Sequence, residues 1–469
     1  MTTTSPIASP RGRAFRSARA LLTGAAALAL ATGCSRDELL AVATPDQITP
    51  EAVNSLAGAQ ALRAAAVGVF SNFYGGTTNV GVNLYVGLLS DELINARPGA
   101  DHIDIRSFNE NVFPAAAWNN FSQAYTAIVR ATRAVNQYYP ANAAKQSQLG
   151  QLYLLRGFAL TIAGELFCNG VPLSDVNDAS PSFTTVTNAE LQTRAVAAFD
   201  SALLVLATTA TDAAARNAAR VGKARALVNL RRLPDAAAVV RAGGDGAASG
   251  AVPTGFVYNM EYSATTLVNT IFDWMVNTAN FGPSEREGGN GLNWRSANDP
   301  RVVISTTSRL GQDGSTPVFT IQGYPNGAAP TILVSGVEAR LIEAEAELST
   351  ANVAGWLAAL NAARSDAAAR TARGISTGAP DVLPPLTDPG SEAARVDLLF
   401  RERGFWMYLQ AHRVGDLRRL VRQYNRPANT VWPTGAYFKG GSYGNDQNIT
   451  PSIAERNNPT WNACTNRDP

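Results

Sequence analysis

The segment DLLFRERGFWMYLQAHRVGDLRRLVRQY, from Asp397 to Tyr424, combines an apolar helical face with many charged residues. At helical spacing, its apolar side chains form one broad stripe: Leu398, Leu399, Phe405, Trp406, Leu409, Leu417 and Leu420. The pattern predicts helix on both sides of Gly415. That glycine allows either one long helix or two helices that meet at a corner beside it.

Charged residues interrupt the apolar stripe, and a charge beside so much aromatic surface can be buried only if it is paired. We expect Glu402 to pair with Arg413, and Asp416 to pair with a nearby arginine. A structural network of ion pairs is the ordinary explanation of such a cluster, and we favour it over a catalytic one.

The order of these charged residues resembles the C-terminal signature of the SusD/RagB family. The residues that carry the resemblance are Glu402-Arg403, His412-Arg413, Asp416-Leu417 and Arg419. The segment departs from the family pattern at Trp406, Gln410 and Ala411, which indicates a divergent member. Members of the family are outer-membrane lipoproteins that help to import nutrients, usually glycans.

Weaker landmarks occur in the family's order along the rest of the chain. They are Arg156-Gly157-Phe158 with Gly170-Val171-Pro172-Leu173, then Asn298-Asp299-Pro300-Arg301, then Leu360-Asn361 with Arg364. The resemblance implies a mainly α, SusD-like fold of tetratricopeptide-type helical hairpins with a long irregular insertion of loops and short strands. It also implies a binding protein that delivers a glycan or oligosaccharide to a TonB-dependent, SusC-like β-barrel transporter.

The N-terminus has the pattern of a lipoprotein signal peptide, residues 1–33. Four arginines from Arg11 to Arg19 precede a short apolar run from Leu21 to Ala31, which is too short to span a bilayer. The run ends in Leu-Ala-Thr-Gly-Cys34, which resembles a lipobox. We therefore expect lipidation at Cys34, a tether over residues 34–48, and an outer-membrane protein that is exposed on the cell surface. The alternative is an ordinary signal peptide that happens to precede a cysteine.

A single domain is expected over residues 49–469. Periodic, alanine-rich segments predict helices over 49–242 and 335–424, with capping boxes at Thr187-x-x-Glu190 and Ser335-x-x-Glu338. Residues 243–334 are rich in Gly, Asn, Thr and Pro and predict loops with short strands. Residues 425–469 predict an irregular tail.

Composition and motifs exclude several functions. Loss of the four signal-peptide arginines takes the formal charge from +2 to −2, so there is no electrostatic case for nucleic-acid binding. The chain has two histidines and no phosphate-binding glycine loop or HExxH motif, so we expect no enzyme activity, metal or cofactor. A glycan hydrolase needs only two facing carboxylates, and Asp91 with Glu92 or Glu285 with Glu287 are the pairs to consider. A lipid-anchored scaffold that binds protein is the other alternative.

Loop aromatics flanked by Gly and Asn are candidates for contact with sugar rings, because sugars stack on aromatic planes while polar side chains bond their hydroxyls. The candidate ligand residues are Phe73, Tyr74, Asn79, Trp274, Trp294 and Arg295. Packing in the core is an equal alternative for each of them. Trp118 and Trp356, which lie in helices, are assigned to the core.

Two thiols remain if Cys34 is lipidated, those of Cys168 and Cys464. A secreted chain leaves the reducing cytosol, so we expect these two cysteines to form a disulfide. Two buried free thiols are the alternative.

Overall fold

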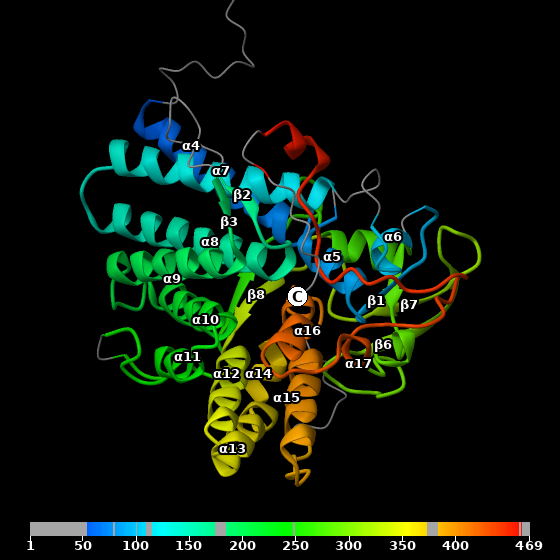
Figure 1. Ribbon diagram of the computed structural model, residues 1–469. Helices are drawn as coiled ribbons and strands as arrows, with labels where there is room; N and C mark the ends of the chain where they lie inside the picture. Colours follow the sequence, from blue (N-terminus) through cyan, green and yellow to red (C-terminus); the bar gives the residue numbers. More distant parts are fainter. Residues whose placement is uncertain are drawn as a thin grey trace, which may run out of the picture. The chain divides into compact units, whose positions relative to one another are not determined.

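Helices that pack on their neighbours in chain order make up most of the structure (Figure 1). The computed structural model describes residues 54–77, 80–99, 101–108, 115–173, 184–246, 249–372, 383–458 and 461. These described residues belong to one compact unit, which begins at Asn54. The mainly α fold predicted from the sequence is confirmed.

The first part of this unit is a stack of helices. Its members are α4 (Leu56–Tyr74), α7 (Ala115–Tyr138), α8 (Ala143–Leu166), α9 (Asn188–Val205), α10 (Ala213–Asn229) and α11 (Leu233–Val240). The stack continues through α12 (Gly336–Ser349) and α13 (Val353–Ser365), which form the predicted hairpin. No helix in the described ranges is both long and apolar enough to cross a membrane.

Local capping signals explain where two of these helices begin. Thr187 and Glu190 form the full capping box predicted for α9, since each side chain accepts a hydrogen bond from the other's backbone N–H. At α12 only half of the predicted box forms. Ser335 Oγ accepts from the Glu338 N–H, but the Glu338 carboxylate points into the interior, 3.6 Å from His412 Nε2.

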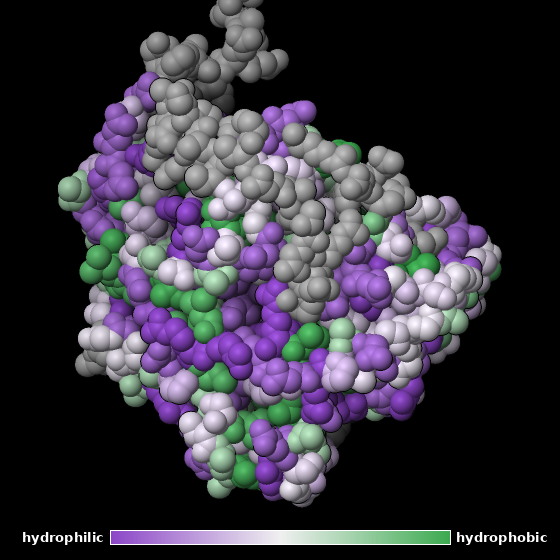
Figure 2. All heavy atoms as spheres, viewed as in Figure 1, coloured by the Kyte–Doolittle hydropathy of each residue, from purple (hydrophilic) through white to green (hydrophobic). Residues whose placement is uncertain are grey.

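The segment around Gly415 forms two helices, α15 (Glu392–Trp406) and α16 (Arg413–Arg422). The corner between them lies at residues 407–412, and Gly415 is inside α16, so a corner at that glycine is wrong. Leu409 and Ala411 make the corner instead, because both have a left-handed backbone with φ of 55° and 56°. Helix α16 faces the viewer near the centre of Figure 1, and hydrophilic residues dominate the same area of Figure 2.

The irregular insertion is held to the helices by short antiparallel strand pairs. Strand β4 (Val257–Met260) pairs with β8 (Thr331–Ser335), which joins the start of the insertion to its end. Strands β6 (Ile304–Leu310) and β7 (Pro317–Ile321) form a hairpin. A third pair, β1 (Leu93–Asn95) with β5 (Phe281–Pro283), ties the insertion to the region after the short helix α5 (Val82–Leu89). The smaller elements are α6 (Asp101–Asp104), β2 (Val171–Leu173), β3 (Thr184–Val186), the π-helix Phe272–Asn277, α14 (Ala367–Ala372), α17 (Ala428–Val431) and the 3-10 helices Glu287–Gly289 and Ile453–Asn457.

Candidate functional site

A network of buried ion pairs surrounds α15 and α16. Glu402 accepts hydrogen bonds from Arg301 and Arg364, with shortest N–O distances of 2.6 and 2.8 Å. Arg413 holds Asp91 instead, with Arg413 Nη2 2.9 Å from Asp91 Oδ2. The prediction that Glu402 pairs with Arg413 is therefore wrong. The two side chains lie on different helices, and each meets a partner from a distant part of the chain.

Asp416 does pair with neighbouring arginines, Arg403 at 2.9 Å and Arg419 at 2.8 Å. Although burial acts against ionisation, the two guanidinium groups lower the pKa of Asp416 well below its usual range. Glu345 of α12 also bonds Arg419, so the network ties α12, α15 and α16 together. Its members are paired with one another, which is the arrangement of a scaffold.

A pocket of about 550 Å³ opens beside the corner between α15 and α16. The corner contributes Tyr408 and Gln410, and the β7–β8 loop contributes Tyr324. Asn259 of β4 and Ile332 of β8 also line it. The volume is that of an ordinary small-molecule site.

Two of the residues that line this pocket each have a buried side-chain oxygen that no donor of the described residues contacts. These oxygens are Gln410 Oε1 and Asn259 Oδ1. Gln410 is only 3% exposed, so its oxygen cannot be served by bulk water. A buried acceptor without a donor costs free energy, and a ligand that supplies a hydroxyl or N–H group removes that cost.

Among the described residues that line the pocket, the one cationic side chain is already paired. Arg301 lines it, but its guanidinium is bonded to both Asp299 and Glu402. Burial of apolar surface together with neutral donors and acceptors is the chemistry that suits a neutral, hydroxyl-rich ligand.

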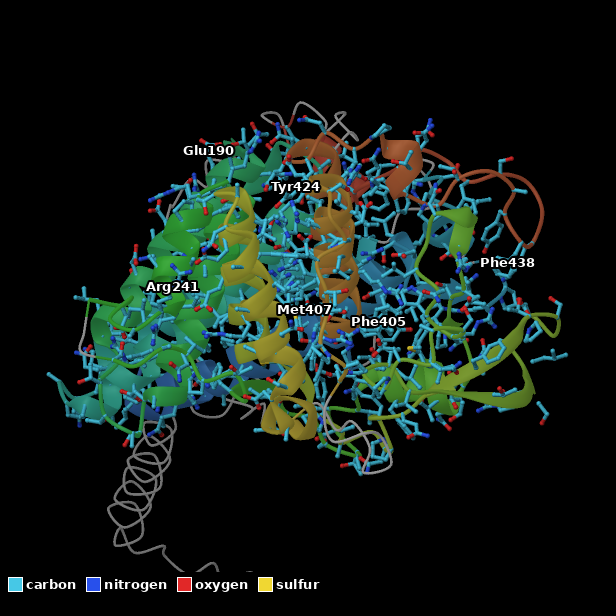
Figure 3. The ribbon with its side chains drawn as sticks, turned by 90° about the horizontal axis from the view of Figure 1, so that it is seen from below. Glu190, Arg241, Phe405, Met407, Tyr424 and Phe438 are labelled. Atoms are coloured by element: carbon cyan, nitrogen blue, oxygen red, sulfur yellow. The ribbon has the colours of Figure 1, made fainter. Side chains whose placement is uncertain are left out.

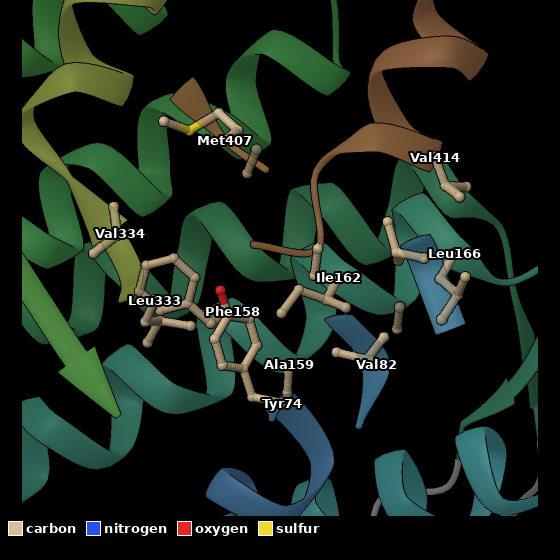
Figure 4. Packing of buried hydrophobic residues seen from close by; sticks show 14 of the residues in the cluster. Tyr74, Val82, Phe158, Ala159, Ile162, Leu166, Leu333, Val334, Met407 and Val414 are labelled. Atoms are coloured by element: carbon tan, nitrogen blue, oxygen red, sulfur yellow. The ribbon is translucent and has the colours of Figure 1, made fainter. Parts of the chain in front are cut away.

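Tyr74 lies beneath the pocket and does not line it. Its hydroxyl donates to the backbone oxygens of Ile332 at 2.6 Å and Gln410 at 3.2 Å, and the residue is fully buried. Figure 4 shows the Tyr74 ring packed between α8 and Leu333 of β8. The neighbouring Phe73 is also buried, where it packs on Phe70 and Phe121. The prediction that Tyr74 and Phe73 contact ligand is corrected, because α4 extends through Tyr74 and turns both rings into the core.

Trp294 is another core residue. It is fully buried, its ring centroid lies 5.0 Å from that of Phe405 and 4.7 Å from that of Tyr408, and its Nε1–H donates to the Asp91 backbone oxygen. Figure 3 shows Phe405 and Met407 at the junction of the helical stack and the insertion. The ligand prediction for Trp294 is corrected in the same way. Trp294 does not line the pocket, but its ring packs on Tyr408, which does.

Trp274 and Arg295 are partly exposed, and each packs against a neighbouring side chain. Phe281 stacks on Trp274 at 5.5 Å, and the Arg97 guanidinium lies 5.1 Å from the Trp274 ring centroid. Arg295 lies 4.1 Å from the ring centroid of Phe319. Neither residue lines the pocket described above. Asn79 lies outside the described residues.

Sequence reasoning missed the residues that line the pocket, Asn259, Tyr324 and Gln410. One signal in the sequence could have indicated Gln410: the chain departs from the family signature at Gln410 and Ala411, which lie in the corner between α15 and α16. Trp118 and Trp356 are buried in the core, as assigned.

The two candidate carboxylate pairs do not line the pocket beside the corner. Asp91 is held by Arg413, and the carboxyl group of Glu92 is buried with Oε1 bonded to the Leu409 N–H. Glu285 accepts hydrogen bonds from the backbone N–H groups of Arg295 and Ser296. Glu287 is buried, and none of the four carboxyl groups lines the pocket.

Cys168 is fully buried and disulfide-bonded. Its predicted partner, Cys464, lies outside the described residues, as does the predicted lipidation site Cys34.

Comparison with known proteins shows which proteins share this fold. No model of a protein family matches the sequence, and no curated protein is similar enough to match it. Solved structures do match. A SusD/RagB family protein from Bacteroides thetaiotaomicron has a TM-score of 0.61 at 14% identity, over 87% of this chain and 96% of that one.

Two further matches are SusD-like carbohydrate-binding proteins. The one from Bacteroides vulgatus has a TM-score of 0.58 at 13% identity, over 77% of this chain and 83% of that one. The one from Bacteroides fragilis has a TM-score of 0.57 at 14% identity, over 78% and 86%. The agreement covers most of each chain, in keeping with the order of the sequence landmarks. This chain therefore has the fold of the SusD/RagB family, in a divergent form.

Proposed function

We propose that the protein is a cell-surface binding lipoprotein that captures a neutral glycan or oligosaccharide in the pocket beside Gln410. The observation that carries this proposal is the pair of unpartnered acceptors, Gln410 Oε1 and Asn259 Oδ1, in a pocket that also contains Tyr324. Sugar hydroxyls donate to such acceptors, and a tyrosine ring supplies a face for stacking. Two of the structural neighbours are carbohydrate-binding proteins, which supports the same ligand class.

The protein then passes its ligand to a TonB-dependent β-barrel transporter. The lipobox at Cys34 supports an anchor in the outer membrane, and residues 34–48 supply a tether. A tethered domain stays near the transporter at a high effective concentration. Weak binding suits capture followed by release.

Titration calorimetry with a panel of neutral oligosaccharides tests the binding step. Gln410→Ala and Asn259→Ala should each weaken binding by about threefold to tenfold, the value of one neutral hydrogen bond. Tyr324→Ala should weaken it as well. Gln146→Ala, a change at an exposed position on α8, is the matched control and should bind as the parent does.

Copurification tests the transporter step. Gently solubilised membranes should yield the protein in complex with a large β-barrel partner. In the calorimetric test, unchanged oligosaccharide affinity of both Gln410→Ala and Asn259→Ala would refute binding in this pocket. Recovery of the protein alone, or with a soluble protein in place of a β-barrel, would favour the scaffold alternative. Release of reducing sugar from any bound glycan would favour the hydrolase.

A lipid anchor predicts a clear labelling result. The Cys34→Ala variant should incorporate no palmitate analogue and remain uncleaved before residue 34, because the acylated thiol is gone. Persistent labelling of this variant would show that the lipid is attached elsewhere or that the signal is of the ordinary kind.

A further inference from the structure

Arg418 is a buried cation on α16, and no carboxylate of the described residues forms an ion pair with it. It is 4% exposed, and its Nη1 donates to the backbone oxygens of Gly164, Glu165 and Phe167 at the C-terminal end of α8. These bonds satisfy the last carbonyls of the helix. They leave Nε and Nη2 of Arg418 with no hydrogen-bond partner.

Nε and Nη2 form one edge of the guanidinium group. This edge can bind a carboxylate or another oxyanion through two parallel hydrogen bonds. The same edge is occupied in several other arginines of this chain. Examples are Arg225 with Glu165, Arg301 with Asp299, Arg395 with Asp388, and Arg413 with Asp91. Arg418 has the same edge in a buried setting without the oxyanion.

Arg418 lines a crevice of about 120 Å³ between α16, the C-terminal ends of α8 and α10, and the N-terminus of α9. Arg422, Asn188, Ala189 and Gln192 also line it. Because a water molecule takes up about 30 Å³ in the liquid, the crevice has room for roughly four waters or for one small oxyanion. We call this site the Arg418 crevice.

The described carboxylates near the crevice are engaged by other partners than Arg418. The carboxylate of Glu165 is engaged by Arg225 and Asn229, and Arg419 is engaged by Glu345 and Asp416. Glu190, at the start of α9, turns its carboxylate back onto Thr187.

Arg422 and the N-terminus of α9 add positive potential to the crevice. Burial, together with repulsion from Arg422, lowers the pKa of Arg418 to about 9. A bound anion would relieve both effects, because it replaces lost solvation and screens the second guanidinium.

We propose that the Arg418 crevice binds one small oxyanion, the carboxylate, sulfate or phosphate group of a ligand, on the Nε and Nη2 edge of Arg418. The side-chain oxygens of Gln192 and Asn188 also lack partners. They accept from a hydroxyl on the ligand or from a water that accompanies it. This site is separate from the pocket beside Gln410 and does not depend on the function proposed for that pocket.

Thermal unfolding and calorimetry of the full mature protein test the proposal. Sodium sulfate, phosphate and acetate are each titrated against sodium chloride at equal ionic strength. At least one of the three should raise the melting temperature in a saturable way that chloride does not reproduce. A response to acetate identifies a carboxylate ligand, and a response limited to sulfate or phosphate identifies a tetrahedral one.

Arg418→Lys keeps a charge that can bond the α8 carbonyls but removes the two-donor edge, so its affinity for the anion should fall at least tenfold. Arg395→Lys, which changes an arginine whose edge is filled by Asp388, is the matched control. Ala189→Glu covers the case in which Arg418→Lys does not fold. It adds a carboxylate at the mouth of the crevice, on the first turn of α9, and should abolish the response to added anion.

A crystal soaked in selenate should show anomalous density beside Arg418. The proposal is overturned if no anion raises the melting temperature beyond chloride, or if Arg418→Lys and the parent respond equally. Either result means that the crevice holds only water.

Discussion

Gln410 lines the pocket between two residues whose backbone conformation is rare for residues other than glycine. The residues on either side, Leu409 and Ala411, both have positive φ, which costs about 1–2 kcal/mol per residue for a side chain other than glycine. Contacts from other elements hold this conformation. Glu92 accepts from the Leu409 N–H, and Tyr74 donates to the Gln410 backbone oxygen. Strain that is maintained by buried contacts at a pocket is typical of a binding site.

Removal of the Tyr74 hydroxyl should loosen this arrangement. Tyr74→Phe leaves the backbone oxygens of Ile332 and Gln410 without their donor, and we expect a loss of about 1–3 kcal/mol in the free energy of unfolding. Glycan affinity should fall as well, because Gln410 is less well positioned. Tyr125→Phe is the control, since it removes a hydroxyl that contacts Arg156 away from the pocket. Urea unfolding and calorimetry measure the two effects, and a stable variant with parental affinity would contradict this role.

Glu92 makes stability depend on pH near neutrality. Burial, reinforced by the adjacent Asp91 carboxylate, raises the pKa of Glu92 to about 8 in the folded protein. The folded state therefore holds a proton that the unfolded chain, with a pKa near 4.5, has already lost. The stability contributed by this proton is complete below about pH 4.5 and is lost as the pH rises towards 8.

Glu92→Gln removes that titration. The free energy of unfolding of the variant, relative to the parent, should rise steadily between pH 5 and pH 8. Urea unfolding at several pH values measures the difference. A difference that does not change with pH would show that Glu92 titrates at an ordinary pKa.

At the scale of elements, the ion pairs around α15 and α16 join segments that are distant in the sequence. Glu402 of α15 meets Arg301 of the insertion and Arg364 of α13. Arg413, at the start of α16, meets Asp91, 322 residues earlier in the chain. These pairs fix how the insertion sits against the helices, and thereby the walls of the pocket.

Glu402→Ala should be strongly destabilising, because it leaves two buried guanidinium groups without their shared carboxylate. We expect a loss of about 3–5 kcal/mol in the free energy of unfolding. Asp397→Ala, on the same helix, removes a carboxylate that is 68% exposed in its pair with Arg426, and should cost less than about 1 kcal/mol. Equal losses in the two variants would mean that burial does not set the value of the Glu402 pairs.

At the scale of the whole molecule, the disulfide of Cys168 constrains the chain. If its partner is Cys464, as the sequence predicts, the bond closes a loop of roughly 300 residues and contributes about 5–6 kcal/mol in the chain-entropy model, before any strain is subtracted. Denatured, unreduced mature protein should then show no reactive thiol, and peptide mapping should recover the two cysteines in one linked fragment. A linked fragment without Cys464, or any free thiol, would contradict the pairing.

The sequence alone determined the fold class and the family resemblance. Helical periodicity, the capping box at Thr187 and the glycine-rich composition of residues 243–334 are local signals, and each depends on residues close together in the chain. Their order was enough to predict paired helices with an irregular insertion. The same local evidence predicted that the charges around α15 and α16 form a structural network.

Only the tertiary structure decided which partners meet and which aromatics are buried. Trp294 and Tyr74 have the flanking residues of exposed loop aromatics, but distant segments cover them: Tyr408 packs on Trp294, and Ile332 bonds Tyr74. The pocket has the same origin, because Asn259 and Gln410 come together only when β4 packs beside the corner after α15. Burial is a property of contacts between residues far apart in the chain, and sequence spacing does not record them.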